Sequence, residues 1–139
     1  MGVLSDLYLA EPKRAKDYDE SQECAEDDRA QYKGITPLEL STLLAIIRGK
    51  DRNVAMMNEF PEIMIVNEGE RVIFEIPHSA MTCFAALPES EFQVAAEAWS
   101  KTDELRCSAE DVRPVIEDIV RLSKRGQETN RLLFLWICI

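Results

Sequence analysis

The sequence predicts a single α+β domain, built from a mixed β-sheet of about four strands packed by about five helices. Its length of 139 residues is that of one ordinary domain. Its composition, 46% hydrophobic and 30% charged, is typical of a globular protein. Strand and helix patterns follow each other over residues 1–139 with no repeat, linker or break in composition, so we expect one domain.

The last strand is expected to lie in the centre of this sheet. Residues 132–139 are an uninterrupted apolar run, LLFLWICI. At a period of two residues both faces of such a strand are apolar, which indicates a strand that is covered on both sides. The run is too short for a membrane span, which takes about 20 apolar residues. We therefore expect helices on both faces of the sheet or, if helices cover only one face, a second copy of the chain on the other.

The N-terminal part of the chain predicts a strand, a short helix and a loop. Residues 2–10 alternate as a strand does, and Pro12 suits the first turn of a helix that reaches about Asp19. The segment 17–31 is rich in acids, with seven of them between Asp17 and Asp28 and no base in that stretch. We expect it to form a solvated, mobile loop.

The middle of the chain predicts a buried helix and a hairpin. Thr36 and Glu39 fit a capping box at the start of the helix, and Gly49 can end it in the left-handed conformation. The helix between them is apolar nearly all round, which is typical of a buried helix. Two β-rich runs follow at 62–66 and 71–76, and the four residues between them predict a hairpin.

Three more helices are predicted before the last strand. The first starts at His78 or Ser79, and the second covers 90–101, where apolar residues recur at helical spacing. The third can be capped by Ser108 or by Asp111. A cap at Ser108 would place Pro114 in the second turn, whereas a cap at Asp111 places it in the first turn, where no amide donor is required, so Pro114 favours Asp111. Gly126 is expected to end this helix.

The charge balance limits the possible partners and locations. Acidic residues outnumber Lys and Arg by 26 to 16, which gives a formal net charge of -10. Such a chain repels phosphate backbones and anionic lipids, so we expect neither nucleic acid nor a membrane as its partner. The N-terminus lacks the pattern of a signal peptide, and the four cysteines form no CxxC pair. We therefore expect a cytoplasmic protein with reduced thiols.

His78 is the single histidine, so any imidazole-based chemistry must use it. Cys83 is the cysteine nearest to it in sequence. Five residues along a helix correspond to about 140° of net rotation, which points the two side chains to different faces. His78 and Cys83 are the candidate catalytic residues, although helix initiation and core packing explain them more simply. A small enzyme or small-molecule-binding protein with a pocket near His78 is the alternative function.

Metal and cofactor sites are not expected. The cysteines and the histidine are too scattered for the paired ligands of a zinc site. The acids from Asp17 to Asp28 match part of a calcium-binding loop, but Gln22 stands where such a loop needs glycine, and Asp28 stands where it needs glutamate. The sequence contains no GxGxxG, GxxxxGK[ST], GxSxG or HExxH motif.

The acidity and the lack of a catalytic pattern favour a protein-interaction or regulatory module, of the kind that includes inhibitors and immunity proteins. Complementary charge speeds the encounter of two proteins and selects the partner, so we expect a basic partner protein. We also expect a homodimer, because the last strand needs cover on both faces. The candidate docking residues are the acids of the predicted loop: Asp17, Asp19, Glu20, Glu23, Glu26, Asp27 and Asp28.

Overall fold

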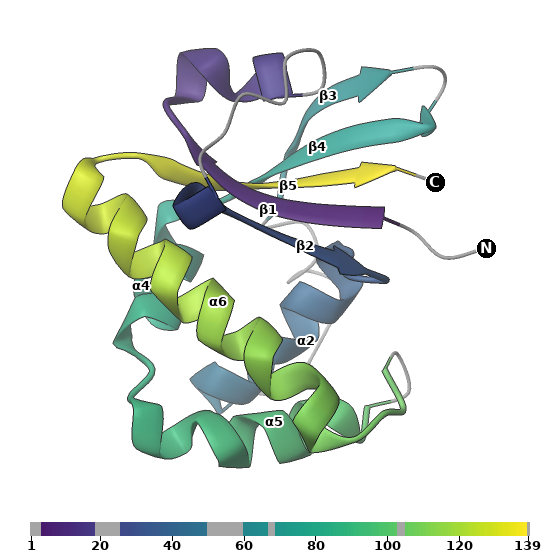
Figure 1. Ribbon diagram of the computed structural model, residues 1–139, viewed down its shortest axis with the longest axis vertical. Coiled ribbons are helices and arrows are strands. Elements are labelled where there is room, and N and C mark those ends of the chain that lie inside the picture. Colours follow the sequence, from purple (N-terminus) through teal and green to yellow (C-terminus); the bar gives the residue numbers. More distant parts are fainter. Residues whose placement is uncertain (1–3, 19–25, 50–59, 67–68, 103–104, 139) are drawn as a thin grey trace.

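The computed structural model describes residues 4–18, 26–49, 60–66, 69–102 and 105–138. These residues form a five-stranded sheet in the order β2-β1-β5-β4-β3, with four α-helices packed against it (Figure 1). Every neighbouring pair of strands is antiparallel. The predicted α+β domain with a central C-terminal strand is confirmed, whereas the sheet has one strand more than expected and is antiparallel throughout.

The elements have the following bounds. The strands are β1 (Leu4–Ala10), β2 (Arg29–Lys33), β3 (Glu62–Val66), β4 (Arg71–Ile76) and β5 (Leu132–Cys138). The α-helices are α2 (Pro37–Arg48), α4 (His78–Ala86), α5 (Phe92–Ser100) and α6 (Ala109–Thr129). Short 3-10 helices lie at η1 (Pro12–Asp17), η2 (Glu26–Asp28) and η4 (Glu89–Glu91). Among the described residues, no helix is long and apolar enough to cross a membrane.

The two faces of the sheet have unequal cover. Figure 1 shows α2, α4, α5 and α6 on one side of the sheet and η1 on the other. On β5, Leu133, Leu135 and Ile137 belong to the main core, which the four α-helices cover. Phe134 and Trp136 alternate with them and point to the opposite face, where they pack in a second cluster. Both faces of β5 are therefore covered, as the apolar run predicted, but by very different amounts of structure.

The main core lies between the sheet and the α-helices. Trp99 of α5 is its largest fully buried side chain, and its indole N–H donates a hydrogen bond of 3.0 Å to the backbone carbonyl of Glu39 in α2. This bond satisfies the one polar atom of a side chain that is otherwise buried among apolar groups. It also fixes α5 against α2.

The second cluster lies on the other face of the sheet, which we call the helix-free face because none of the four described α-helices covers it. The rings of Tyr8 and Tyr18 stack with their centroids 3.9 Å apart, and Phe134 lies next to Tyr8 at 5.6 Å. The Tyr8 hydroxyl donates to the carbonyl of Ala15 at 2.7 Å, and the Tyr18 hydroxyl donates to the carboxylate of Asp6. Aromatic stacking and two hydroxyl bonds thus hold η1 on the sheet.

Local sequence signals explain α2 and the hairpin as predicted. Thr36 and Glu39 form the expected capping box, and Gly49 ends α2 with a left-handed φ of 68°. β3 and β4 pair with each other over the two predicted runs. These predictions are confirmed because capping and hairpin pairing depend on residues close together in sequence.

The start and end of α6 differ from the prediction. Ser108, not Asp111, is the N-cap, and Asp111 completes a capping box as the third residue of the helix. Pro114 therefore lies inside the helix, where it removes one hydrogen bond. The capping box offsets this loss by satisfying two amides that would otherwise lack partners. The helix then continues through Gly126 and ends at Thr129, with Asn130 in the left-handed conformation (φ 56°).

Gly126 serves the packing of α6 and not its termination. A Cβ atom at this position would lie 2.6 Å from the Met81 Cε atom and 2.9 Å from the backbone oxygen of Arg131. Glycine therefore allows α6 to approach α4 and the start of β5. Sequence alone does not distinguish a glycine needed for close packing from one that ends a helix.

β2 is the strand that the sequence analysis missed. It falls at the end of the expected acidic loop, and residues 29–31 form strand where loop was predicted. Ala30 and Tyr32 pack against the main core, and the Tyr32 hydroxyl donates to the Asp118 carboxylate on α6. Because charged residues precede Arg29, the short alternation of partly buried and exposed positions in β2 was not recognised as a strand. Only the pairing of β2 with β1 identifies it.

Candidate functional site

A groove with a volume of about 520 Å³ opens on the helical side of the molecule. Its size lies within the range of about 300–1,000 Å³ that is usual for small-molecule sites. Four elements contribute to it: η2, η4, the start of α5 and the C-terminal half of α6. Its lining consists of Asp27, Glu89, Phe92, Glu117, Val120, Arg121, Lys124, Arg125 and Glu128.

The groove combines an apolar floor with carboxylates around it. Phe92 and Val120 are buried members of the main core that reach the surface here. Four carboxylates line the groove and are exposed: Asp27, Glu89, Glu117 and Glu128. Within the described residues, the carboxylates of Asp27, Glu89 and Glu128 make no hydrogen bond or ion pair, whereas Glu117 pairs with Arg113 at 3.2 Å.

The arginines of the groove have partners within the protein. Arg121 donates to the backbone carbonyl of Asp27 at 2.7 Å and lies 3.5 Å from the carboxylate of Asp118. Arg125 donates from Nε to the Asp28 carboxylate at 2.5 Å. Lys124 is the third cation of the lining and makes no ion pair with the described part of the chain. Most of the positive charge in the groove is therefore already neutralised, while most of the negative charge is not.

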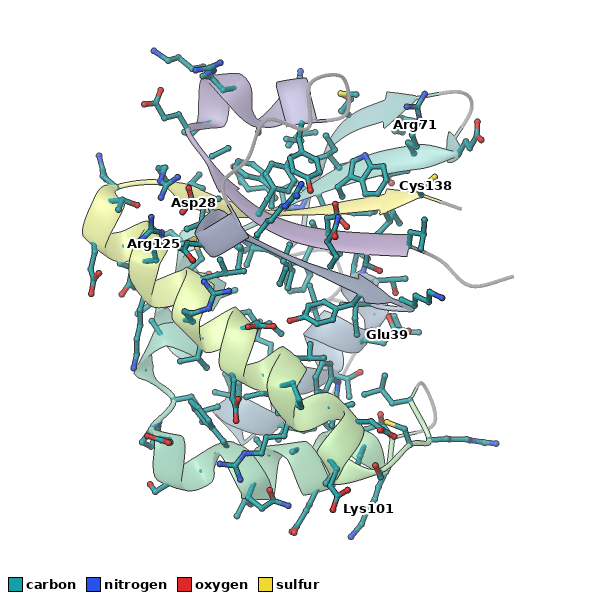
Figure 2. The ribbon with its side chains drawn as sticks, viewed as in Figure 1. Asp28, Glu39, Arg71, Lys101, Arg125 and Cys138 are labelled. Carbon is teal, nitrogen blue, oxygen red and sulfur yellow. The ribbon has the colours of Figure 1, made fainter. Side chains whose placement is uncertain are left out.

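Asp28 is the centre of the ion pairs that hold this region together. Its carboxylate accepts two hydrogen bonds from Arg131, at 2.9 and 3.0 Å, in addition to the bond from Arg125. Figure 2 shows Asp28 and Arg125 side by side where η2 meets α6. The bonds from Arg131, followed by that from Arg125, lower the pKa of Asp28 to about 2, against the opposing effect of burial. Asp28 thus joins η2 to α6 and to the start of β5.

The predicted docking residues differ in exposure and in their partners. Asp27 is exposed and lines the groove, whereas Asp28 is only 9% exposed and is bonded to two arginines. Asp19, Glu20 and Glu23 lie outside the described residues. Asp17 and Glu26 belong to η1 and η2, but their side chains lie outside the described part of the chain. Asp27 is therefore the residue that links the predicted acidic surface to the observed groove.

The remaining groove residues were not predicted as site residues from the sequence. Glu117, Arg121, Lys124 and Glu128 recur at intervals of three or four residues, so they form one stripe along α6. That spacing was visible in the sequence. The approach of Asp27 and Glu89 to the stripe was not, because it depends on tertiary packing.

The two candidate catalytic residues are not brought together with a third group. His78 is exposed at the start of α4, whereas Cys83 is partly buried and packs against the main core. His78 lines a separate pocket, and the described residues around it include neither a cysteine nor a carboxylate. In the described part of the chain, no group of three or more His, Cys, Asp or Glu side chains is placed to hold a metal ion.

The described cysteines are Cys83, Cys107 and Cys138, and all three are free thiols. Cys107 is exposed, and partial desolvation followed by the charge of Asp111 raises its thiol pKa. A raised pKa lowers the fraction of reactive thiolate. Cys107 therefore lacks the electropositive environment that activates a nucleophilic cysteine.

A hollow of about 390 Å³ lies on the helix-free face, next to the edge strand β2. Leu4, which is 48% exposed, and Trp136 give it apolar surface. Asp6 also lines the hollow and accepts hydrogen bonds from Tyr18 and from Gln31, the latter at 3.3 Å. Within the described ranges, no α-helix covers this part of the sheet.

Comparison of the chain with protein-family models, with curated proteins and with solved structures found no match.

Proposed function

We propose that this protein is a protein-interaction module of the inhibitor or immunity kind, which binds a basic segment of a partner protein in the groove that Asp27 lines. One observation carries the proposal. The carboxylates of Asp27, Glu89 and Glu128 come from three separate elements, surround an apolar floor and have no cationic partner within the described residues. These three carboxylates are therefore available to a cationic side chain of a partner protein.

This arrangement fits a lysine or arginine side chain. The aliphatic part of such a side chain can pack on Phe92 and Val120 while its charged end stays among the carboxylates. Exposed ion pairs contribute only about 0–1 kcal/mol each. The affinity therefore has to come from apolar contact and from several charges acting together, and the net charge of -10 accelerates the encounter.

The ion pairs of Asp28 have a supporting role in this proposal. They hold η2 against α6, and Arg121 adds a hydrogen bond to the backbone of Asp27. These contacts fix the position of Asp27 before a partner arrives. A fixed site loses less conformational entropy on binding than a mobile one.

Charge reversal within and outside the groove tests the proposal. The probe is a fluorescent peptide of alternating lysine and leucine residues, and its affinity is measured by fluorescence anisotropy. We expect the Glu89→Lys/Glu128→Lys variant to bind about tenfold more weakly than a Glu62→Lys/Glu97→Lys control, which has the same net charge. Equal losses of affinity in the two variants would show that net charge alone attracts the peptide and would contradict the groove.

We further propose that a second copy of the chain covers the open part of the helix-free face. The support is the one-sided placement of the α-helices and the hollow lined by Leu4 and Trp136. Light scattering during size-exclusion chromatography should give the mass of a dimer, and Leu4→Lys should shift it towards the mass of a monomer. A wild-type protein that remains monomeric at high concentration would refute this association.

The free thiols of the described cysteines support the cytoplasmic location that we propose for this activity, since thiols persist in a reducing compartment.

A further inference from the structure

A second pocket, with a volume of about 430 Å³, lies where the chain turns from α6 into β5. The start of α4 and the first residue of η1 complete it. It shares no lining residue with the groove of Asp27. Its lining consists of Pro12, His78, Met81, Gly126, Gln127, Asn130, Arg131 and Leu132.

The polar side chains of this pocket are basic or neutral. They are the imidazole of His78, the amides of Gln127 and Asn130, and the guanidinium of Arg131, all of which can donate hydrogen bonds. None of the described residues that line it is an acid, although the chain has 26 acidic residues. A guanidinium and an imidazole with no carboxylate among the described lining residues favour an anion over a cation.

A cluster of ion pairs lies next to the pocket. The guanidinium of Arg131 bonds to Asp28 and to the hydroxyl of Thr129, so it acts on the pocket through its field more than through free hydrogen bonds. Asp28 is also paired with Arg125. Arg125 and Arg131 therefore both bond to Asp28, and Arg131 brings its guanidinium to the pocket in a protein of net charge -10.

The pocket also offers apolar contact. The side chain of Met81 is fully buried in the main core and reaches the lining, and Pro12 and Leu132 add further apolar surface. A volume of about 430 Å³ exceeds the space that one small inorganic ion needs. The preferred ligand therefore has an apolar body as well as a charge.

We propose that this pocket binds a small organic anion, with one carboxylate or phosphate group held by His78, Gln127 and Asn130 and an apolar body packed on Met81 and Leu132. The site is independent of the proposed protein interaction, because it involves other residues on a different face of α6. Its failure would leave the groove proposal unchanged.

The single histidine makes the test direct, because its ring signals in an NMR spectrum need no assignment. Acetate, benzoate and inorganic phosphate are titrated into the protein while the His78 ring signals are followed. We expect benzoate to bind about tenfold more tightly than acetate, because its ring buries additional apolar area. Tighter binding of phosphate than of either carboxylate would identify a phosphate compound as the ligand class. No shift with any of the three anions at millimolar concentrations would overturn the proposal.

Two variants with the same chemical change localise the binding. Gln127→Glu places a carboxylate in the pocket and should weaken benzoate binding at least tenfold. Gln93→Glu introduces the same charge on exposed α5, outside the pocket, and should leave the affinity within about twofold. Equal effects of the two variants would mean that the anion responds to net charge and not to this pocket. Both positions are exposed, so both variants should fold.

Discussion

The two faces of the sheet are buried by different means. On one face, four α-helices cover the apolar side chains of every second residue of β5, and contacts within the main core are almost entirely apolar. On the helix-free face, a 3-10 helix of six residues covers a small cluster in which Tyr8 and Tyr18 are stacked and hydrogen-bonded. Because the main core buries more apolar side chains, the loss of a large side chain is expected to cost more there than in the small cluster.

The comparison also locates the surface features on which function depends. The groove lies on the helix-covered side of the molecule, whereas the anion pocket lies between α6, α4 and the first residue of η1, at the edge between the two faces. The helix-free face is thin and partly open, which suits association with another chain. We therefore expect the basic partner on the helix-covered side of the sheet and a subunit contact on the other.

The largest effect is expected in the main core. Trp99→Ala should reduce the free energy of unfolding by about 3–5 kcal/mol, because it leaves a large cavity and removes the hydrogen bond to Glu39. Urea denaturation measures this loss. Val94→Ala on the same helix is the control, since Val94 is 67% exposed and its replacement should cost less than about 0.5 kcal/mol. A small effect of Trp99→Ala would mean that α5 contributes little to the core.

A smaller but localised effect is expected on the helix-free face. Tyr18→Ala should cost about 2–3 kcal/mol, because it removes the stacked ring over Tyr8 and the donor to Asp6. Tyr18→Phe keeps the ring and should cost about 1 kcal/mol. Urea denaturation of both variants separates the contribution of the aromatic ring from that of the hydroxyl group. If Tyr18→Phe and Tyr18→Ala are equally destabilising, the hydroxyl bond and not the ring holds η1.

The ion pairs of Asp28 join the sheet to α6 at the edge between the two faces, and they give a pH-dependent contribution. The pKa of Asp28 is lowered from 3.8 to about 2 in the folded protein, so the carboxylate stabilises the fold at pH values above its unfolded pKa. This contribution, about 2 kcal/mol at most, is lost as the pH falls from about 4 to about 2. Wild type and Asp28→Asn should therefore differ in unfolding free energy near neutral pH and converge in acid. A difference that persists at the acidic end would assign the effect to packing.

The smallest effect concerns the approach of α6 to the sheet. Gly126→Ala should destabilise the protein by about 1–2 kcal/mol, because the added Cβ meets Met81 and the Arg131 backbone. Helix propensity alone predicts the opposite sign, a gain of about 1 kcal/mol. Thermal unfolding of Gly126→Ala shows whether the steric effect or the helix propensity of alanine is larger. An increase in Tm would show that α6 has room to move and that Gly126 is not needed for close packing.

Local patterns in the sequence were sufficient for α2, the hairpin and β5. The capping box of Thr36 and the apolar run of β5 act within a few residues, so no tertiary information is required to interpret them. β2 and the end of α6 were missed for a common reason. The strand β2 exists because β1 and α6 supply partners for it, and Gly126 is needed because α4 and β5 lie against it.

The candidate site was predictable only in part. The acidity of the segment before β2 pointed to Asp27, which does line the groove. Asp28 carries the same charge at the next position, yet it is buried between Arg125 and Arg131. Composition does not distinguish an acid that faces solvent from one that pairs with distant arginines, since both pairs join residues more than 90 positions apart.

The most direct test of the proposed function is to map where a basic peptide binds. The alternating lysine–leucine peptide is titrated into isotope-labelled protein, and backbone amide shifts are followed by NMR. We predict that the largest shifts gather on η2, η4 and the C-terminal half of α6, around Asp27, Glu89 and Lys124. Shifts concentrated instead on the helix-free face, around Leu4 and Gln31, would contradict the groove as the binding site.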